Sequence, residues 1–244
     1  VLYILPSFRP NKSQTKDDPS VIKRRFCAVC LACLLSFYIT SFYTFDSIRF
    51  IKLWPVKLEK MASGVYLTLL LFSGPLFEWQ WADKGWKTCL LDGVDDMACW
   101  IGWRNYVVGP FTEEFVFRGC IVSLFVLVKS SECKIIFLTP FFFGIAHLHH
   151  FYEFYLSKPE LWRLGIFRSV FQFSYTTIFG WYAVFLFLRL ETLWAPVIAH
   201  AFCNVMGLPR LWGRVNGGLI NTVAYYLILI SGMVGFIRGI VDLI

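Results

Sequence analysis

The chain has 244 residues, of which 57% are hydrophobic and only 16% are charged, and its formal net charge is +7. Because soluble domains carry closer to a quarter charged residues, this composition excludes an ordinary soluble domain and favours an all-α, polytopic integral membrane protein. Much of the basic excess lies in the polar segments that flank the first apolar run, and no nucleic-acid-binding motif accompanies it. We therefore expect contact with membrane lipid and no nucleic-acid partner.

Apolar runs predict about seven helices along the chain. Several of the runs reach the roughly 20 residues that a spanning helix needs, and the shorter ones are typical of helices buried within a bundle. The predicted helices are 26–45, 61–80, 105–128, 134–148, 166–189, 193–206 and 218–238. Polar loops are expected at 83–96 and 149–165. The first residues, VLYILPSF, are typical of the end of an earlier helix, so we expect the N-terminal helix to be truncated.

The stretch EEFVFR (113–118) places three charges inside the apolar run 105–128. At the centre of a membrane helix each charge costs roughly 2.5–3.5 kcal/mol, so the three cost on the order of 8–10 kcal/mol before partners are counted. Glu114 and Arg118 are four residues apart and can form an ion pair on one helix face. Glu113 has no such partner within the helix, so we expect its pKa to rise, as a general base near neutral pH requires. A purely structural pairing would explain Glu114 and Arg118 but not Glu113.

Two later apolar segments also carry polar side chains. The segment FFFGIAHLHH (141–150) contains His147, which by itself could be a hydrogen-bonded core residue. His149 and Glu153 are four residues apart and could hold a metal ion. The segment APVIAHAFCNVMG (195–207) puts His200 and Asn204 on one helix face. Two donors on one face can stabilise an oxyanion or can clamp two neighbouring membrane helices.

If the helices pack in chain order, side chains from three of them can converge in one place. Glu113, His147, His200 and Asn204 would then supply a base, a second base or acid, and hydrogen-bond donors. This is the inventory of a hydrolase that lacks a nucleophilic serine or cysteine. The motifs G-x-S-x-G and H-E-x-x-H are both absent from the sequence.

Three motifs in this order resemble those of the type II CAAX prenyl endopeptidases. They are Glu113-Glu114 with Arg118, Phe143 with His147, and His200 with Asn204. Further stretches similar to the eukaryotic Ras-converting members are DDPSVIKRRF, RNYVVGPFTEEFVFRGC, PFFFGIAHLHH and FQFSYTTIFG, so the resemblance runs from about residue 17 to residue 210. It implies one membrane-embedded protease domain over residues 1–244, a bundle of about seven to eight transmembrane helices with an intramembrane active-site cavity.

The resemblance also implies an activity and a location. The protein would be a multi-pass protease of the endoplasmic reticulum membrane, with its active site open to the cytosolic side. It would cut after the prenylated cysteine of farnesylated or geranylgeranylated CAAX proteins, such as Ras-like small GTPases, and release the last three residues. Residue roles follow: water activation by Glu113 and His147, an oxyanion hole from His200 and Asn204, and support from Glu114 and Arg118.

Two alternatives stay open from the sequence. A zinc protease could use Glu113, His147 and His200 as ligands, but no short-range ligand pair anchors a metal there, so we expect no cofactor. A membrane scaffold, or a carrier with Glu113 as a proton relay, would also keep acids in a bundle. Such a protein has no need for His147 together with the pair formed by His200 and Asn204.

Overall fold

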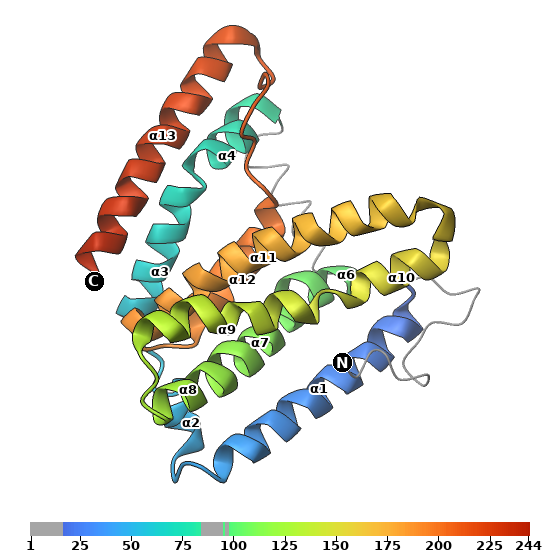
Figure 1. Ribbon diagram of the computed structural model, residues 1–244. Coiled ribbons are helices and arrows are strands. Elements are labelled where there is room, and N and C mark those ends of the chain that lie inside the picture. Colours follow the sequence, from blue (N-terminus) through green and yellow to red (C-terminus); the bar gives the residue numbers. More distant parts are fainter. Residues whose placement is uncertain (1–16, 84–94, 96–97) are drawn as a thin grey trace.

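The computed structural model describes residues 17–83, 95 and 98–244, and its regular secondary structure there is entirely helical (Figure 1). Residues 1–16, which include the apolar start, and most of the predicted loop 83–96 lie outside the described residues. The elements are α1 (Pro19–Ser41), α2 (Ser47–Phe50), α3 (Leu58–Leu71), α4 (Ser73–Phe77), η3 (Glu78–Asp83), α6 (Trp100–Gly102), η4 (Trp103–Val108), α7 (Gly109–Glu114), η5 (Phe115–Val122), α8 (Ser123–Leu127), α9 (Glu132–Ala146), α10 (His149–Ser157), η6 (Pro159–Leu161), α11 (Trp162–Leu190), α12 (Trp194–Met206) and α13 (Gly218–Asp242).

The predicted helix 61–80 is divided in the structure into α3, α4 and η3, with a bend of 75° at the break after Leu71. Each of the other six predicted helices corresponds to one helical run, although some boundaries differ. The first begins at Pro19 and not at residue 26, because a helix can include basic residues near its end, where long side chains extend toward water. Asp18 precedes Pro19, whose ring suits the first turn of a helix. The prediction that 149–165 forms a loop is wrong, since α10 and η6 occupy most of it. Phe151 and Phe154 of α10 pack against Gly165 of α11, and this apolar contact stabilises the extra helix.

Length and composition allow three of the described helical segments to cross a membrane. They are Glu132–Ser157, Pro159–Leu190 and Gly218–Asp242. A fourth crossing is possible if Leu58–Leu71 and Ser73–Trp81, which are bent by 75° at their junction, count as one span. The structure therefore supports an all-helical membrane protein, while a total of seven to eight spans stays a prediction.

Helices α9 and α11 pack closely against each other, and this packing fixes the position of the helix that ends beside His147. The two helices run side by side (Figure 1). A Cβ atom added to Gly180 of α11 would lie 2.6 Å from Cβ of Pro140, and one added to Gly144 of α9 would lie 2.8 Å from Thr177 Oγ1 and from the Phe173 ring. Only glycine fits at such distances, so these two positions let the helix backbones pack closely.

The short helix α12 lies inside the bundle and packs against α3, α7 and α11. Its buried side chains are small on one side, which allows this close packing, and they include His200. Two buried apolar clusters meet at the junction of α11 and α12. The first joins residues of η5, α9, α11 and α12, and the second joins residues of α3, α11 and α12. The core therefore fixes α12 against the helix that carries EEFVFR.

Candidate active site

The charged helix changes its geometry around the EEFVFR stretch. Residues 100–127 form one continuous helical run in which α-helical segments alternate with the wider π-helical segments η4 and η5. The Gly109 N–H donates to the Arg104 carbonyl, and a Cβ on Gly109 would lie 2.7 Å from that oxygen. Pro110 follows and has no N–H to donate. π-Helical turns occur frequently at functional sites, and here they flank the α7 turn that ends with Glu113 and Glu114.

Glu114 and Arg118 form the predicted ion pair, and it is completely buried. Arg118 donates through its Nη1 atom to Glu114 Oε1 at 3.0 Å, and the side chains are 1% and 0% exposed, respectively. The rings of Phe143 and Phe179 lie 4.6 and 5.7 Å from the guanidinium carbon. Among the described residues no hydrogen-bond acceptor meets Arg118 Nε or Nη2. The guanidinium is therefore held by one carboxylate and two aromatic faces.

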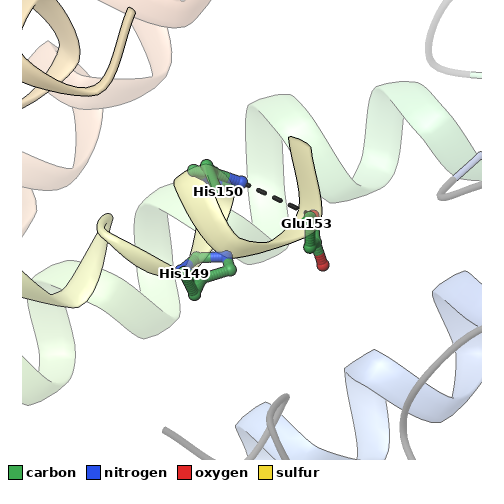
Figure 2. Close-up of side chains that lie close together, drawn as sticks. All are labelled: His149, His150 and Glu153. Carbon is green, nitrogen blue, oxygen red and sulfur yellow. Dashed lines mark ion pairs between the residues drawn. The ribbon is translucent and has the colours of Figure 1, made fainter. Parts of the chain in front are cut away.

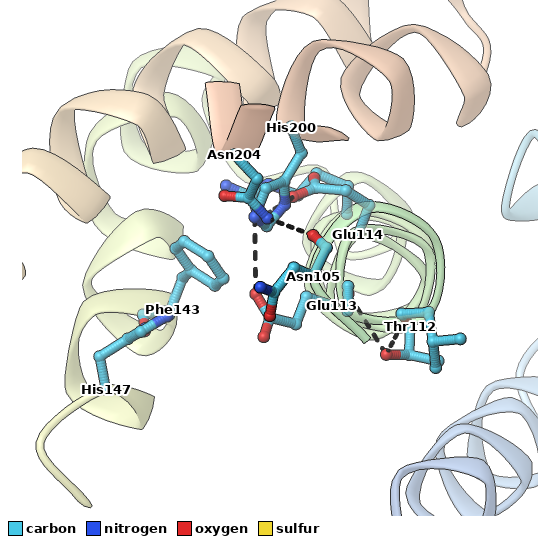
Figure 3. A network of polar contacts seen from close by, with 11 residues as sticks. Asn105, Thr112, Glu113, Glu114, Phe143, His147, His200 and Asn204 are labelled. Atoms are coloured by element: carbon cyan, nitrogen blue, oxygen red, sulfur yellow. Dashed lines mark hydrogen bonds and ion pairs between the residues drawn. The ribbon is translucent and has the colours of Figure 1, made fainter. Parts of the chain in front are cut away.

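His200 extends this pair into a three-residue chain. Its Nδ1 atom lies 2.8 Å from Glu114 Oε1, across a sequence separation of 86 residues. An ionised carboxylate only accepts hydrogen bonds, so Nδ1 carries a proton and Glu114 fixes the orientation of the ring. The other ring nitrogen, Nε2, faces Glu113 Oε2 at 3.8 Å. Glu113 thus has no partner within its own helix, as predicted, but it faces His200 of α12 (Figure 3).

His147 lies across from this cluster at the end of α9 (Figure 3). Its Nδ1 atom lies 2.8 Å from the Phe143 carbonyl oxygen, which can only accept, so Nδ1 carries the proton and Nε2 carries the lone pair. The ring of Phe143 contacts both histidines, with centroid distances of 4.6 Å to His147 and 6.0 Å to His200. Among the described residues no hydrogen bond joins His147 to Glu113. The structure therefore gathers the four predicted site residues from α7, α9 and α12 in one region.

Asn204 reveals a partner that the sequence did not indicate. Its Nδ2 atom donates to the backbone carbonyl of Asn105 at 2.8 Å, which joins α12 to η4 (Figure 3). The Asn105 side chain accepts from Arg104 Nε at 2.9 Å, and Arg104 pairs with Asp17 at the start of α1. The sequence feature that could have indicated Asn105 is its polar side chain at the start of the apolar run 105–128. No comparable signal marked Phe179.

An apolar pocket of about 310 Å³ is lined in part by Leu148, the residue after His147. It lies between the α9–α10 junction and α11. Its lining residues are Leu148, Phe151, Ile166, Ser169, Val170 and Phe173. Leu148 follows His147 directly in the chain, and the apolar lining suits an apolar group of a ligand.

The residues of the zinc alternative do not form a compact ligand set. In the described part of the chain, the group of three metal-binding side chains whose ligand atoms lie within 4.8 Å of one another is His149, His150 and Glu153. Glu113, His147 and His200 do not form such a group there. His200 also directs its Nδ1 atom to Glu114, which leaves one ring nitrogen for other chemistry.

Comparison with known proteins agrees with the geometry. The family model described as "Type II CAAX prenyl endopeptidase Rce1-like" matches residues 95–206, a range that contains all six predicted site residues. The chain is 37% identical over 243 residues to "Probable CAAX prenyl protease 2" of Schizosaccharomyces pombe, an alignment that covers 99% of this chain and 88% of the relative. It is 33% identical over 237 residues to "CAAX prenyl protease 2" of Homo sapiens, covering 86% of this chain and 67% of that protein. No solved structure matches the chain. The chain therefore belongs to the type II CAAX prenyl endopeptidases, a family of membrane peptidases.

Proposed function

We propose that this chain hydrolyses the peptide bond after the prenylated cysteine of C-terminal CAAX sequences and releases the last three residues. The observation that carries the proposal is the meeting of Glu113, Glu114 and His200 at the end of α7, with His147 facing them from α9. Hydrolysis of an amide without a covalent intermediate needs a base for water and donors for the oxyanion, and these side chains can supply both.

Water activation falls to Glu113 and His147. The Glu113 side chain is 36% exposed, so a water molecule can reach its carboxylate, whereas the Glu114 side chain is fully buried. Glu113 takes a proton from water. His147 presents the lone pair of Nε2, since its Nδ1–H is committed to the Phe143 carbonyl. Once this nitrogen has accepted from Glu113 the proton taken from water, it can pass that proton to the leaving amine.

Stabilisation of the oxyanion falls to His200 and Asn204. Because Nδ1–H of His200 is committed to Glu114, its Nε2 atom can donate only when both ring nitrogens carry protons. In that form the charges of Glu113, Glu114, Arg118 and His200 sum to zero. A neutral set suits an apolar interior, where an uncompensated charge is costly. Asn204 has a second N–H on Nδ2 beside the one that Asn105 accepts, and this second N–H is directed to the oxyanion.

The apolar pocket beside His147 is the proposed site of the prenyl chain. Its lining is almost wholly apolar and includes Leu148, the residue that follows His147 in the chain. Each CH₂ group that leaves water for such a site contributes about 0.8 kcal/mol. Farnesylated or geranylgeranylated CAAX proteins, including small GTPases, are the proposed substrates. All seven helices are proposed to cross or enter the endoplasmic reticulum membrane, with the site open to the cytosol and without a metal ion.

Release of a tripeptide from a prenylated peptide tests this function. Purified protein in detergent or nanodiscs should cleave a farnesylated CAAX peptide and leave the unprenylated peptide intact. Glu113→Ala should abolish cleavage, because it removes the base. Glu59→Ala is the matched control, since Glu59 is an exposed carboxylate of α3 away from the cluster. Full activity of Glu113→Ala, or equal cleavage of the unprenylated peptide, would contradict the proposal.

A further inference from the structure

A second group of side chains that could bind a metal ion lies outside the proposed catalytic cluster. His149, His150 and Glu153 occupy the first turns of α10 and gather on one side of it (Figure 2). Their ligand atoms all lie within 4.8 Å of one another, and the rings of His149 and His150 are 3.9 Å apart. The proposed hydrolysis uses none of the three. Two imidazoles and a carboxylate at such distances are a ligand set for a metal ion.

The surroundings of the group hold its members in metal-binding form. His149 Nδ1 lies 2.7 Å from the Ala146 carbonyl oxygen, so Nδ1 carries the proton and the lone pair remains on Nε2. Metal-binding histidines commonly donate their other N–H to a carbonyl in this way. Glu153 is oriented by Arg25 of α1, which pairs with Oε1, while Oε2 faces His150 Nδ1 at 3.7 Å. One carboxylate oxygen is thus held by Arg25 and the other faces His150.

Donor chemistry selects the ion. Nitrogen donors from two imidazoles with one carboxylate oxygen suit Zn²⁺ and its neighbours in the first transition row, whereas Ca²⁺ and Mg²⁺ prefer oxygen donors throughout. Three protein ligands leave a fourth position of a tetrahedral zinc ion for water or another ligand.

The exposure of its side chains makes the group accessible to an ion. The group belongs to the helical segment Glu132–Ser157, which has 26 residues. The group lies near the C-terminal end of this segment and beside the basic start of α1 (Figure 1). The side chains of His150 and Glu153 are 43% and 35% exposed. Because these two side chains are partly exposed, an ion can reach the group from outside the protein.

We propose that His149, His150 and Glu153 bind one zinc ion at the start of α10, at a site separate from the catalytic cluster. The bound ion fixes the α9–α10 junction, because the group begins two residues after His147. The site does not depend on the proposed proteolytic function, since its ligands take no part in the chemistry.

Cobalt is a suitable probe because Co²⁺ occupies zinc sites and absorbs visible light there. The purified, tag-free protein, first treated with chelator, should bind one equivalent of Co²⁺, and Zn²⁺ should displace it. His149→Ala and His150→Ala should each weaken binding at least tenfold. The same two variants should keep peptide cleavage in chelator, which shows that they fold. Bound Zn²⁺ should also raise the thermal unfolding midpoint of the parent protein but not of these variants.

The double variant His147→Ala/His200→Ala distinguishes this site from a zinc ion in the catalytic cluster. It lacks both catalytic imidazoles but keeps the α10 group, so it should bind Co²⁺ with the parental stoichiometry and affinity. Loss of binding in this double variant, with binding retained in His149→Ala, would move the ion to the catalytic cluster and overturn the proposal. Absence of saturable Co²⁺ binding by the parent protein would overturn it as well.

Discussion

Glu114→Gln separates the two tasks that the buried carboxylate performs. Glu114 Oε1 accepts hydrogen bonds from Arg118 at 3.0 Å and from His200 at 2.8 Å, and the carboxylate and guanidinium are both inaccessible to water. Glutamine has the same shape and can still accept at Oε1, but it carries no charge. The substitution therefore leaves the Arg118 guanidinium as a buried cation without a counter-charge, while it weakens the bond that orients His200.

Two estimates of the loss in stability agree. Coulomb's law at 3.0 Å with an effective dielectric constant of about 20 gives roughly 5.5 kcal/mol for the pair, an upper value because desolvation is not subtracted. Removal of one partner from a buried ion pair costs about 3–5 kcal/mol. At about 2–4 °C per kcal/mol for a chain of this size, the unfolding midpoint should fall by roughly 6–20 °C. The kcat for peptide cleavage should fall by about 10²–10³-fold, as when one oxyanion donor is lost.

A double variant shows whether stability and activity have separate causes. Glu114→Gln/Arg118→Met removes the buried cation together with its counter-charge, so the unfolding midpoint should return close to the parental value. Activity should stay low, because His200 still lacks its carboxylate. Thermal unfolding in detergent and prenyl-peptide cleavage measure the two quantities on the same samples. If activity returned together with stability, Glu114 would serve only to neutralise Arg118, and the proposed orientation of His200 would be refuted.

Three further results are expected. Asn204→Ala should lower kcat by about 10²–10³-fold with little change in the unfolding midpoint, because its side chain is exposed and, within the described residues, bonds only the Asn105 carbonyl. An unchanged kcat would exclude it from the oxyanion hole. Gly180→Ala should destabilise the protein, since its new Cβ would lie 2.6 Å from Cβ of Pro140. The control Gly235→Ala should be tolerated, because its new Cβ would meet the flexible end of the Leu70 side chain at 3.3 Å. Equal unfolding midpoints of the two variants would contradict the close packing of α9 and α11. Exhaustive chelation should leave peptide cleavage at the parental rate, and loss of activity that zinc restores would favour a metal-dependent mechanism.

The sequence predicted best those contacts that lie within one helix. The spacing of Glu114 and Arg118 gave their ion pair, because the pitch of a helix is nearly the same in every protein. The positions of the seven helices followed from long apolar runs for a similar reason. Sequence reasoning failed for α10, where aromatic residues such as Phe154 pack against α11. Local polarity indicated a loop there, and a tertiary contact decided otherwise.

By itself, the amino-acid sequence determined that this protein is a helical membrane protein and that its costly polar groups lie on three particular helices. Only the tertiary structure decided that Glu114 binds His200 as well as Arg118, that Glu113 faces His200, and that Asn204 bonds to Asn105. The reason is geometric. Positions along one helix are related by a fixed rise and rotation, whereas contacts between helices depend on how each is rotated and how closely the small residues of its neighbours let it approach.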